Sequence, residues 1–185
     1  MPTTTQKRRL RVTRTLGVAA VAALVMSCDK AITQTEALLP LTAASVDASA
    51  ADHIRDAEMS EVRAARTFAL LNMAMHDASV ASWEAKYFYF NRRPSQLDAQ
   101  IKTDIGLLNF PGYPSGHSTF SAAAASVLSY VFPGSSTEFT QMADDAGMSR
   151  LYSSIHFQSD IQEGKAHGAR VGAFSVRRAQ ADGAP

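Results

Sequence analysis

The sequence predicts an all-α protein, a helical bundle, on three observations. Apolar residues recur at helical spacing between residues 52 and 84, where Ala, Glu, Arg, Leu and Met dominate. Prolines and glycines interrupt such segments, as in "FPGYPSGH" and in "PG" at 133–134. No convincing alternation of apolar and polar residues, with the period of two typical of a β-strand, is present. With 46% apolar and 19% charged residues over 185 positions, the composition fits one globular domain.

The first 27 residues have the order of a secretory signal peptide, with basic residues followed by an eleven-residue apolar run from Leu16 to Met26. The single cysteine, Cys28, comes directly after "LVMS", and "VMSC" resembles a bacterial lipobox. This resemblance implies cleavage before Cys28 and attachment of lipid to its sulfur, and a chance buried cysteine is the alternative. We therefore expect an exported bacterial protein, lipid-anchored on the periplasmic side of the membrane or at the cell surface. A lone cysteine excludes an internal disulfide.

Removal of residues 1–27 changes the formal charge from +1 to −4, because this segment contains five basic and no acidic residues. A negatively charged mature chain is not expected to bind nucleic acid. Residues 28–50 are small, polar and unpatterned, which predicts a tether, and residues 51–185 then form the helical domain. No run reaches the 18 apolar residues of an ordinary membrane-spanning helix.

The helices of this domain are predicted in order along the chain. They lie at 52–84 (one or two helices), 115–132, 135–147, 149–154 (a short stretch) and 157–178. Residues 91–114 contain three prolines and predict a loop. Pro133 and Gly134 end the helix that precedes them. Ser135, with Glu138 three residues later, matches a capping box and predicts the start of the next helix.

Three segments, "KYFYFNRRP", "PSGHS" and "SRLYSSIHFQSD", concentrate side chains that suit a tetrahedral oxyanion. Their candidate residues are Lys86, Arg93, Ser115, Gly116, His117, Arg150, His156 and Asp160. Arginine matches phosphate oxygens with paired donors, lysine adds a compact charge, and free backbone N–H groups at a helix start bind anions. If the last helix includes both residues, Asp160 can accept a hydrogen bond from His156, whose other ring nitrogen is then a base or a nucleophile.

These groups predict phosphoryl-transfer chemistry or a reaction on a similar oxyanion. His156 would attack the central atom, and His117 would protonate the leaving oxygen and then activate water against the phosphohistidine. His117, His156 and Asp160 are also a zinc-like ligand set, but three nearby cations oppose a divalent metal. A serine hydrolase acting through Ser115 is disfavoured because "GYPSG" is not a G-x-S-x-G elbow. A non-catalytic structural lipoprotein is a further alternative.

The ordered motifs K-x6-R-P, P-S-G-H and S-R-x5-H-x3-D, over Lys86 to Asp160, resemble those of one superfamily. This superfamily joins type 2 phosphatidic acid phosphatases, bacterial acid phosphatases and vanadium-dependent haloperoxidases, and the resemblance implies their helical bundle. It also implies the role of each residue. The oxyanion ligands would be Lys86, Arg93, Ser115, Gly116 and Arg150, the acid–base residue His117, the covalent or apical ligand His156, and the residue that positions it Asp160.

The flanking sequence resembles the haloperoxidase branch more than the lipid phosphatases. Trp83 and Phe110 stand where aromatic residues line the halide site of chloroperoxidase-like members, and "LLNMAMHDASVASWEAKY" resembles secreted bacterial haloperoxidase-like proteins. This resemblance implies vanadate bound through His156, with hydrogen peroxide and a halide as substrates. The alternative, a metal-independent acid phosphatase, implies a phosphate ester and no cofactor. Related proteins carry further helices before the position of Arg66, and the sequence leaves the oligomeric state open.

Overall fold

The computed structural model describes residues 43–184, and the predicted signal peptide and Cys28 lie outside the described residues. Its α-helices are α2 (Ala43–Asp56), α3 (Glu61–Tyr89), α4 (Pro94–Leu97), α5 (Gly116–Val131), α6 (Ser136–Tyr152) and α7 (Gln158–Ala181), with a 3₁₀ turn, η1 (Pro133–Ser135). The described part of the chain contains no β-strand, so the all-α prediction is confirmed. None of the helices between residues 43 and 184 has the length and apolar character needed to cross a bilayer.

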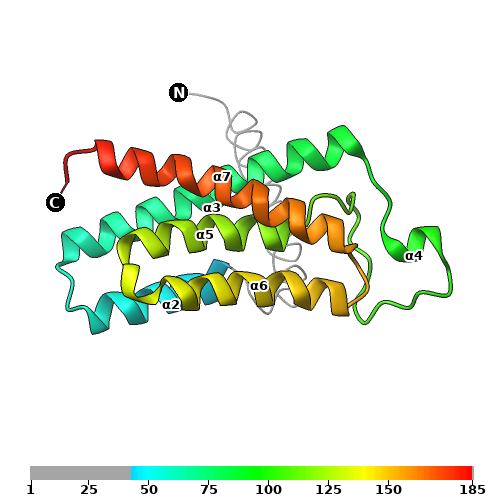
Figure 1. Cartoon of the computed structure of the whole chain (residues 1–185), viewed down its shortest axis with the longest axis horizontal. Helices are drawn as coiled ribbons and strands as arrows, with labels where there is room; N and C mark the ends of the chain where they lie inside the picture. The colour runs from blue at the N-terminus through cyan, green and yellow to red at the C-terminus, as the bar shows by residue number, and fades with distance from the viewer. Residues whose placement is uncertain (1–42, 185) are drawn as a thin grey trace, which may run out of the picture. The chain divides into compact units, whose positions relative to one another are not determined.

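Helix α5 is the central element and packs against α3, α6 and α7 (Figure 1). Its contact with α7 is very close because α7 carries glycine at every fourth position of one face, at Gly164, Gly168 and Gly172. A Cβ atom at Gly168 would lie 2.0 Å from the carbonyl oxygen of Thr119 on α5. The two helix backbones therefore meet without intervening side chains, and this fixes the start of α7 against the start of α5.

The apolar core and a buried polar cluster occupy different parts of the bundle. The core is built mainly from α3 and α5, with Phe139 added by α6, and its other large residues are Leu70, Leu71, Met75, Val127 and Leu128. The polar cluster lies where the C-terminal ends of α3 and α6 meet the N-terminal ends of α5 and α7, beside the loop that joins α3 to α5 (Figure 1). Two helix N-termini thus point into one buried polar region.

The structure differs from the sequence prediction at two boundaries. Helix α2 begins at Ala43, inside the predicted tether 28–50, and Ala50 is fully buried. Val46 and Ala50, one turn apart, pack on the core cluster, so a weakly patterned segment is helical because tertiary contacts hold it. Ser135 makes no side-chain capping bond, so the predicted capping box is wrong, since the 3₁₀ turn leads directly into α6. The stretch 149–154 is the last turn of α6 and the residues that follow it.

Candidate active site

The structure brings the eight predicted site residues to the same end of the bundle. Lys86 lies in the last turn of α3, and Arg150 in the last turn of α6. Arg93 precedes α4, and Ser115 is the N-cap of α5. Gly116 and His117 begin α5, His156 lies two residues before α7, and Asp160 belongs to the first turn of α7. The ends of α3 and α6, the starts of α5 and α7, and the adjoining loops all contribute, so the site depends on the packing of these four helices.

His156 is oriented by Asp160. Its Nδ1 lies 3.0 Å from Oδ2 of Asp160, and both side chains are almost completely buried. The same carboxylate oxygen accepts from the backbone N–H of Phe157 at 3.1 Å. His156 precedes α7 rather than lying within it, so the two residues do not share one helical face, yet the predicted hydrogen bond between them forms. It forms because Asp160 caps the first turn of α7 and thereby faces back toward His156.

The other ring nitrogen of His156 faces the guanidinium of Arg93, with 3.3 Å between Nε2 and Nη1. Because an arginine can only donate, Nε2 is the acceptor and Nδ1 carries the proton donated to Asp160. Burial, assisted by the charges of Arg93 and Lys86, lowers the pKa of His156 to about 4, although Asp160 opposes this shift. At neutral pH the imidazole is therefore neutral, with an Nε2 lone pair turned toward the cations.

His117, the second residue of α5, is the other histidine of the site. Burial lowers its pKa to about 3, and repulsion from Arg150, from His156 when it is protonated, and from Lys86 and Arg93 acts in the same direction. Its Nε2 is buried and has no hydrogen-bond partner. A buried ring nitrogen without a partner costs free energy, so a bound group that forms a hydrogen bond with this atom would be stabilising.

Ser115 ends the loop and starts α5. Its fully buried hydroxyl oxygen accepts from the N–H of Ser118 at 3.4 Å and from the hydroxyl of Ser118 at 3.1 Å. Since Ser115 accepts in both contacts, its own hydroxyl proton can still be donated. The N–H groups of Gly116 and His117 belong to the first turn of α5, where backbone donors have no intrahelical acceptor. The start of α5 thus offers a hydroxyl and backbone amides to an anion.

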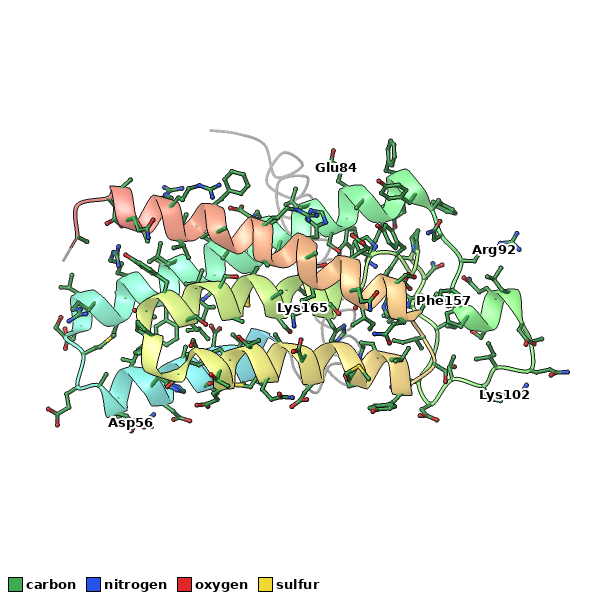
Figure 2. The ribbon with its side chains drawn as sticks, viewed as in Figure 1. Asp56, Glu84, Arg92, Lys102, Phe157 and Lys165 are labelled. Carbon is green, nitrogen blue, oxygen red and sulfur yellow. The ribbon has the colours of Figure 1, made fainter. Side chains whose placement is uncertain are left out.

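Arg93 is fully buried, whereas its neighbour Arg92 is exposed and points away from the bundle (Figure 2). The guanidinium donates from Nη1 to the carbonyl of Ile155 at 2.9 Å and from Nε to that of Phe110 at 3.4 Å. Its Nη2 is buried and has no partner. One edge of Arg93 is therefore anchored, and Nη2 remains available to a ligand.

Lys86 is also fully buried, and its ammonium is surrounded by backbone carbonyls. Nζ donates to Pro111 at 3.0 Å, to Gly112 at 3.0 Å and to Pro114 at 2.6 Å. Burial, together with the charge of Arg93, lowers the pKa of Lys86 to about 7, while Asp160 raises it. The sequence could not indicate these partners, because they are backbone carbonyls, and every residue has one.

Three aromatic rings form a wall beside the start of α5. The rings of Trp83 and Phe110 lie 5.0 Å apart, and Trp83 stacks on Phe120 at 6.1 Å. Lys86 Nζ lies 5.2 Å from the centre of the Phe110 ring, and Arg93 lies at the same distance from it. Sequence reasoning missed Phe120, although its place one turn after Gly116 on α5 puts both residues on one helical face.

The cluster carries excess positive charge in a buried environment. Lys86, Arg93 and Arg150 are three buried cations, and Asp160 is the carboxylate that acts on the first two of them. Burying charge away from water is strongly unfavourable, and Arg93 Nη2 has no partner, so this arrangement suits a bound anion. Within residues 43–184, no group of three or more His, Cys, Asp or Glu is arranged to hold a metal ion.

Two pockets flank the cluster, and neither is lined by His117 or His156. One, of about 380 Å³, lies between α3 and α7 and includes Phe88, Tyr113 and Glu163. The other, of about 450 Å³, lies beside the loop that follows α3 and includes Tyr87, Phe90 and Phe110. Phe110 thus borders both the buried cations and an open pocket.

Comparisons with known proteins point to the superfamily that the sequence motifs resemble. Residues 65–183 match the family model of the PAP2 superfamily. Non-specific acid phosphatases of Salmonella typhi and Salmonella typhimurium are 31% and 30% identical over 104 residues, which are 54% of this chain and 42% of each relative. A crystal structure described as the first bacterial vanadium-dependent iodoperoxidase superposes with a TM-score of 0.66 at 28% identity, over 72% of this chain and 38% of that one. The chain spans less than half the length of these relatives.

Proposed function

The chain belongs to the PAP2 superfamily, and on this premise we propose that it is an enzyme that binds a tetrahedral oxyanion at the start of α5. The observation that carries this proposal is the pair of buried, unpartnered atoms, Arg93 Nη2 and His117 Nε2, within a cluster of excess positive charge. An oxyanion would offer an acceptor to both atoms and balance the buried cations. Neither a purely structural role nor a serine hydrolase explains these unpartnered groups.

Our first candidate activity is that of a vanadium-dependent haloperoxidase. The residues fit vanadate, because the Nε2 lone pair of His156 would hold it, and Arg93 Nη2, Ser115 and the first amides of α5 would donate hydrogen bonds to it. Bound vanadate would supply the Lewis-acid chemistry that activates hydrogen peroxide for oxygen transfer to a halide. His117 Nε2 would hold and move the proton, and Trp83 with Phe110 would exclude water on the halide side. The likeness to the vanadium-dependent iodoperoxidase structure supports this choice.

The second candidate, a metal-independent acid phosphatase, is favoured by the curated relatives of that name. Here His156 Nε2 would attack phosphorus, and the phosphorus–oxygen ester bond would break as His117 donates a proton to the leaving oxygen. His117 would then take a proton from water, whose oxygen bonds to phosphorus while the electron pair of the phosphorus–nitrogen bond returns to His156. The cations would stabilise the charge on the equatorial oxygens throughout.

Two assays on the full chain separate the candidates. The first measures peroxide-dependent oxidation of iodide, bromide and chloride after reconstitution with orthovanadate, and the second measures hydrolysis of p-nitrophenyl phosphate without vanadate. Halide oxidation supports the first candidate, and hydrolysis without any halide oxidation leaves the phosphatase. Inactivity in both assays, with no oxyanion bound, would leave the non-catalytic alternative. His156→Ala is expected to abolish whichever activity is present, because both need its ring nitrogen.

Phe110→Ala tests the aromatic wall. It should impair halide oxidation and leave ester hydrolysis largely unchanged, because phosphate needs only the cations and the two histidines. Phe174→Ala is the matched control, since this phenylalanine is exposed on α7. Equal losses of both activities in Phe110→Ala would argue against a halide role. EDTA should affect neither activity. If EDTA abolishes an activity and added zinc restores it, the zinc-site alternative is supported instead.

We also propose that the mature protein is an exported lipoprotein anchored through Cys28. The support is the order of basic, apolar and small residues before this cysteine. Mass spectrometry of the native N-terminus checks it, and an unmodified chain cleaved at another position would contradict it.

A further inference from the structure

We propose that the pocket of about 450 Å³ beside the loop that follows α3 binds the aromatic ring of a phenol, which is the organic substrate or leaving group of the neighbouring oxyanion site. The part of this inference that makes the phenol a reactant rests on the proposed function, whereas the binding of a phenol to the pocket does not. Phe90, at the end of α3, is the residue on which we expect this preference to depend.

The pocket combines aromatic rings with amide side chains. Its three aromatic rings are those of Tyr87, Phe90 and Phe110. The rings of Tyr87 and Phe90 lie 6.2 Å apart and are tilted against each other, a spacing typical of paired aromatic rings. Its polar side chains are those of Asn91, Arg92, Gln96 and Asn109. Amide groups both donate and accept hydrogen bonds, so they suit a hydroxyl group, and the described residues that line the pocket include no carboxylate that would repel a phenolate.

Phe90 occupies an unfavourable backbone conformation. It ends α3 with φ of 51° and ψ of 40°, in the left-handed region where a side chain is disfavoured and glycine is the usual residue. Phe90 is also 67% exposed, so its ring gains little from burial within the chain. Such strained residues gather at binding and active sites, so a large aromatic ring at this position points to contact with a ligand.

Phe110 joins this pocket to the oxyanion cluster. Its ring centre lies 5.2 Å from Lys86 Nζ and 5.2 Å from Arg93 Cζ, and the same residue lines the pocket. The N–H of Gly112 donates to the carbonyl of Asn91 at 3.0 Å, which ties the loop of Phe110 to the segment that follows α3. A ring bound in the pocket would therefore lie against Phe110, beside the cations that would hold the oxyanion.

A phenol fits both candidate activities. In the hydrolysis of an aryl phosphate the phosphorus–oxygen ester bond breaks, and the phenol oxygen receives the proton that His117 donates. In a halogenation, the halogen that hydrogen peroxide has oxidised bonds to a ring carbon of the phenol, and that carbon releases its proton to water. The pocket would hold the same kind of ring in either case, so the choice between the two activities does not alter the ligand.

The other pocket, of about 380 Å³, differs in its charge and supplies a control. It is lined by Glu84 and Glu163, whose carboxylates would repel a phenolate, and Phe110 is not part of its lining. Phe88, two residues before Phe90, lines this other pocket and is 78% exposed. Phe88→Ala therefore removes the same side chain from a neighbouring position and is the matched control for Phe90→Ala.

Binding of 4-nitrophenol to the full chain, without any oxyanion present, tests the pocket. The bound nitrophenyl ring should quench the fluorescence of Trp83, the single tryptophan of the chain, whose ring lies 5.0 Å from that of Phe110. Phe90→Ala should weaken this affinity at least about tenfold, whereas Phe88→Ala should leave it within about twofold of the wild type. Phenol should displace the probe, and cyclohexanol, which has no aromatic ring, should do so at least about tenfold more weakly. Wild-type affinity in Phe90→Ala, or equal displacement by cyclohexanol, would overturn the proposal.

Phe90→Gly separates the role of the ring from that of the backbone. Glycine relieves the left-handed conformation, so the urea midpoint should rise, while the affinity for 4-nitrophenol should fall as it does in Phe90→Ala. A variant that is more stable than the wild type cannot have lost binding through unfolding. Unchanged affinity in Phe90→Gly would contradict a contact between the Phe90 ring and the ligand.

The results for the pocket and for the proposed function can be told apart. If the wild type binds 4-nitrophenol through Phe90 but binds neither phosphate nor vanadate, the proposed function fails and the pocket is supported. If it binds phosphate but no 4-nitrophenol, the proposed function stands and the pocket proposal is wrong. Where hydrolysis is present, Phe90→Ala should raise the KM for p-nitrophenyl phosphate and not that for glycerol 2-phosphate, which has no ring. An equal rise in both KM values would contradict a site for the aromatic group.

Discussion

His117 is kept neutral by burial and by the cations around it, and its pKa of about 3 applies to the protein without an anion. A bound oxyanion balances those charges and gives Nε2 an acceptor, so the pKa of His117 should rise on binding. Phosphate binding near pH 5 should therefore be accompanied by proton uptake. Calorimetric titrations in buffers of different ionisation enthalpy measure this number of protons, and the uptake should disappear in His117→Gln. Binding without any proton uptake in the wild type would show that His117 stays neutral.

In the proposed mechanism Asp160 acts through His156, whose Nδ1 it orients. Asp160→Asn is nearly isosteric, but its amide offers a weaker acceptor to Nδ1 and can donate instead, which favours the wrong tautomer. Turnover should fall at least about a hundredfold while phosphate affinity changes much less. Steady-state kinetics and the melting temperature check this together. An unchanged turnover would mean that other contacts fix the tautomer of His156.

At the scale of single residues, the sequence predicted polar side chains that the structure brings to one end of the bundle. Motif spacing separated the buried Arg93 from the exposed Arg92, and it paired His156 with Asp160. It could not find the carbonyl partners of Lys86, because these belong to the backbone. It also missed Phe120, because a single aromatic residue in an alanine-rich helix is equally typical of a core.

At the scale of elements, the glycines of α7 determine how closely α7 approaches α5. Gly168→Ala improves intrinsic helix propensity, but the new Cβ would lie 2.0 Å from a backbone oxygen that cannot move aside. We expect a loss of at least about 2 kcal/mol in the free energy of unfolding, measured in urea. Gly134→Ala is the matched control, because nothing lies within 4 Å of its added Cβ. A Gly168→Ala protein as stable as the wild type would show that α5 and α7 can separate.

Helix boundaries were predictable from the sequence where a local residue such as proline ends the helix, but not where tertiary contacts determine the boundary. Pro133 ends α5 through the loss of a backbone donor, which is a local effect visible in the sequence. The start of α2 depends on Val46 and Ala50 packing on the core, and nothing local distinguishes this segment from a tether. Ser135 has the right neighbours for a capping box, but the preceding 3₁₀ turn gives it a conformation that does not cap.

At the scale of the whole molecule, the bundle combines an apolar core with a buried polar cluster that costs stability when it holds no anion. The cluster places three cations and two neutral histidines away from water, and helix packing compensates for that cost. A ligand that binds only the folded protein raises its stability by mass action. The fold class was predictable because it depends on the average pattern of many residues, whereas the charge balance of the cluster depends on which helix ends meet.

The last prediction concerns the stability of the anion-free protein in acid. The pKa values of His117 and His156, about 3 and about 4, lie below the ordinary value of 6.5, so the unfolded chain binds more protons between these limits. The stability that these two neutral histidines contribute is then fully present above pH 6.5 and is lost progressively as the pH falls toward 4. At pH 5 each histidine should have removed about 2 kcal/mol from the free energy of unfolding. Urea unfolding at pH 7 and pH 5 measures the loss, and the double variant His117→Gln with His156→Gln should show much less of it. An equal loss in this variant would assign the acid sensitivity to other groups. In the wild type, saturating phosphate should reduce the loss of stability at pH 5, because the anion favours the folded, protonated site.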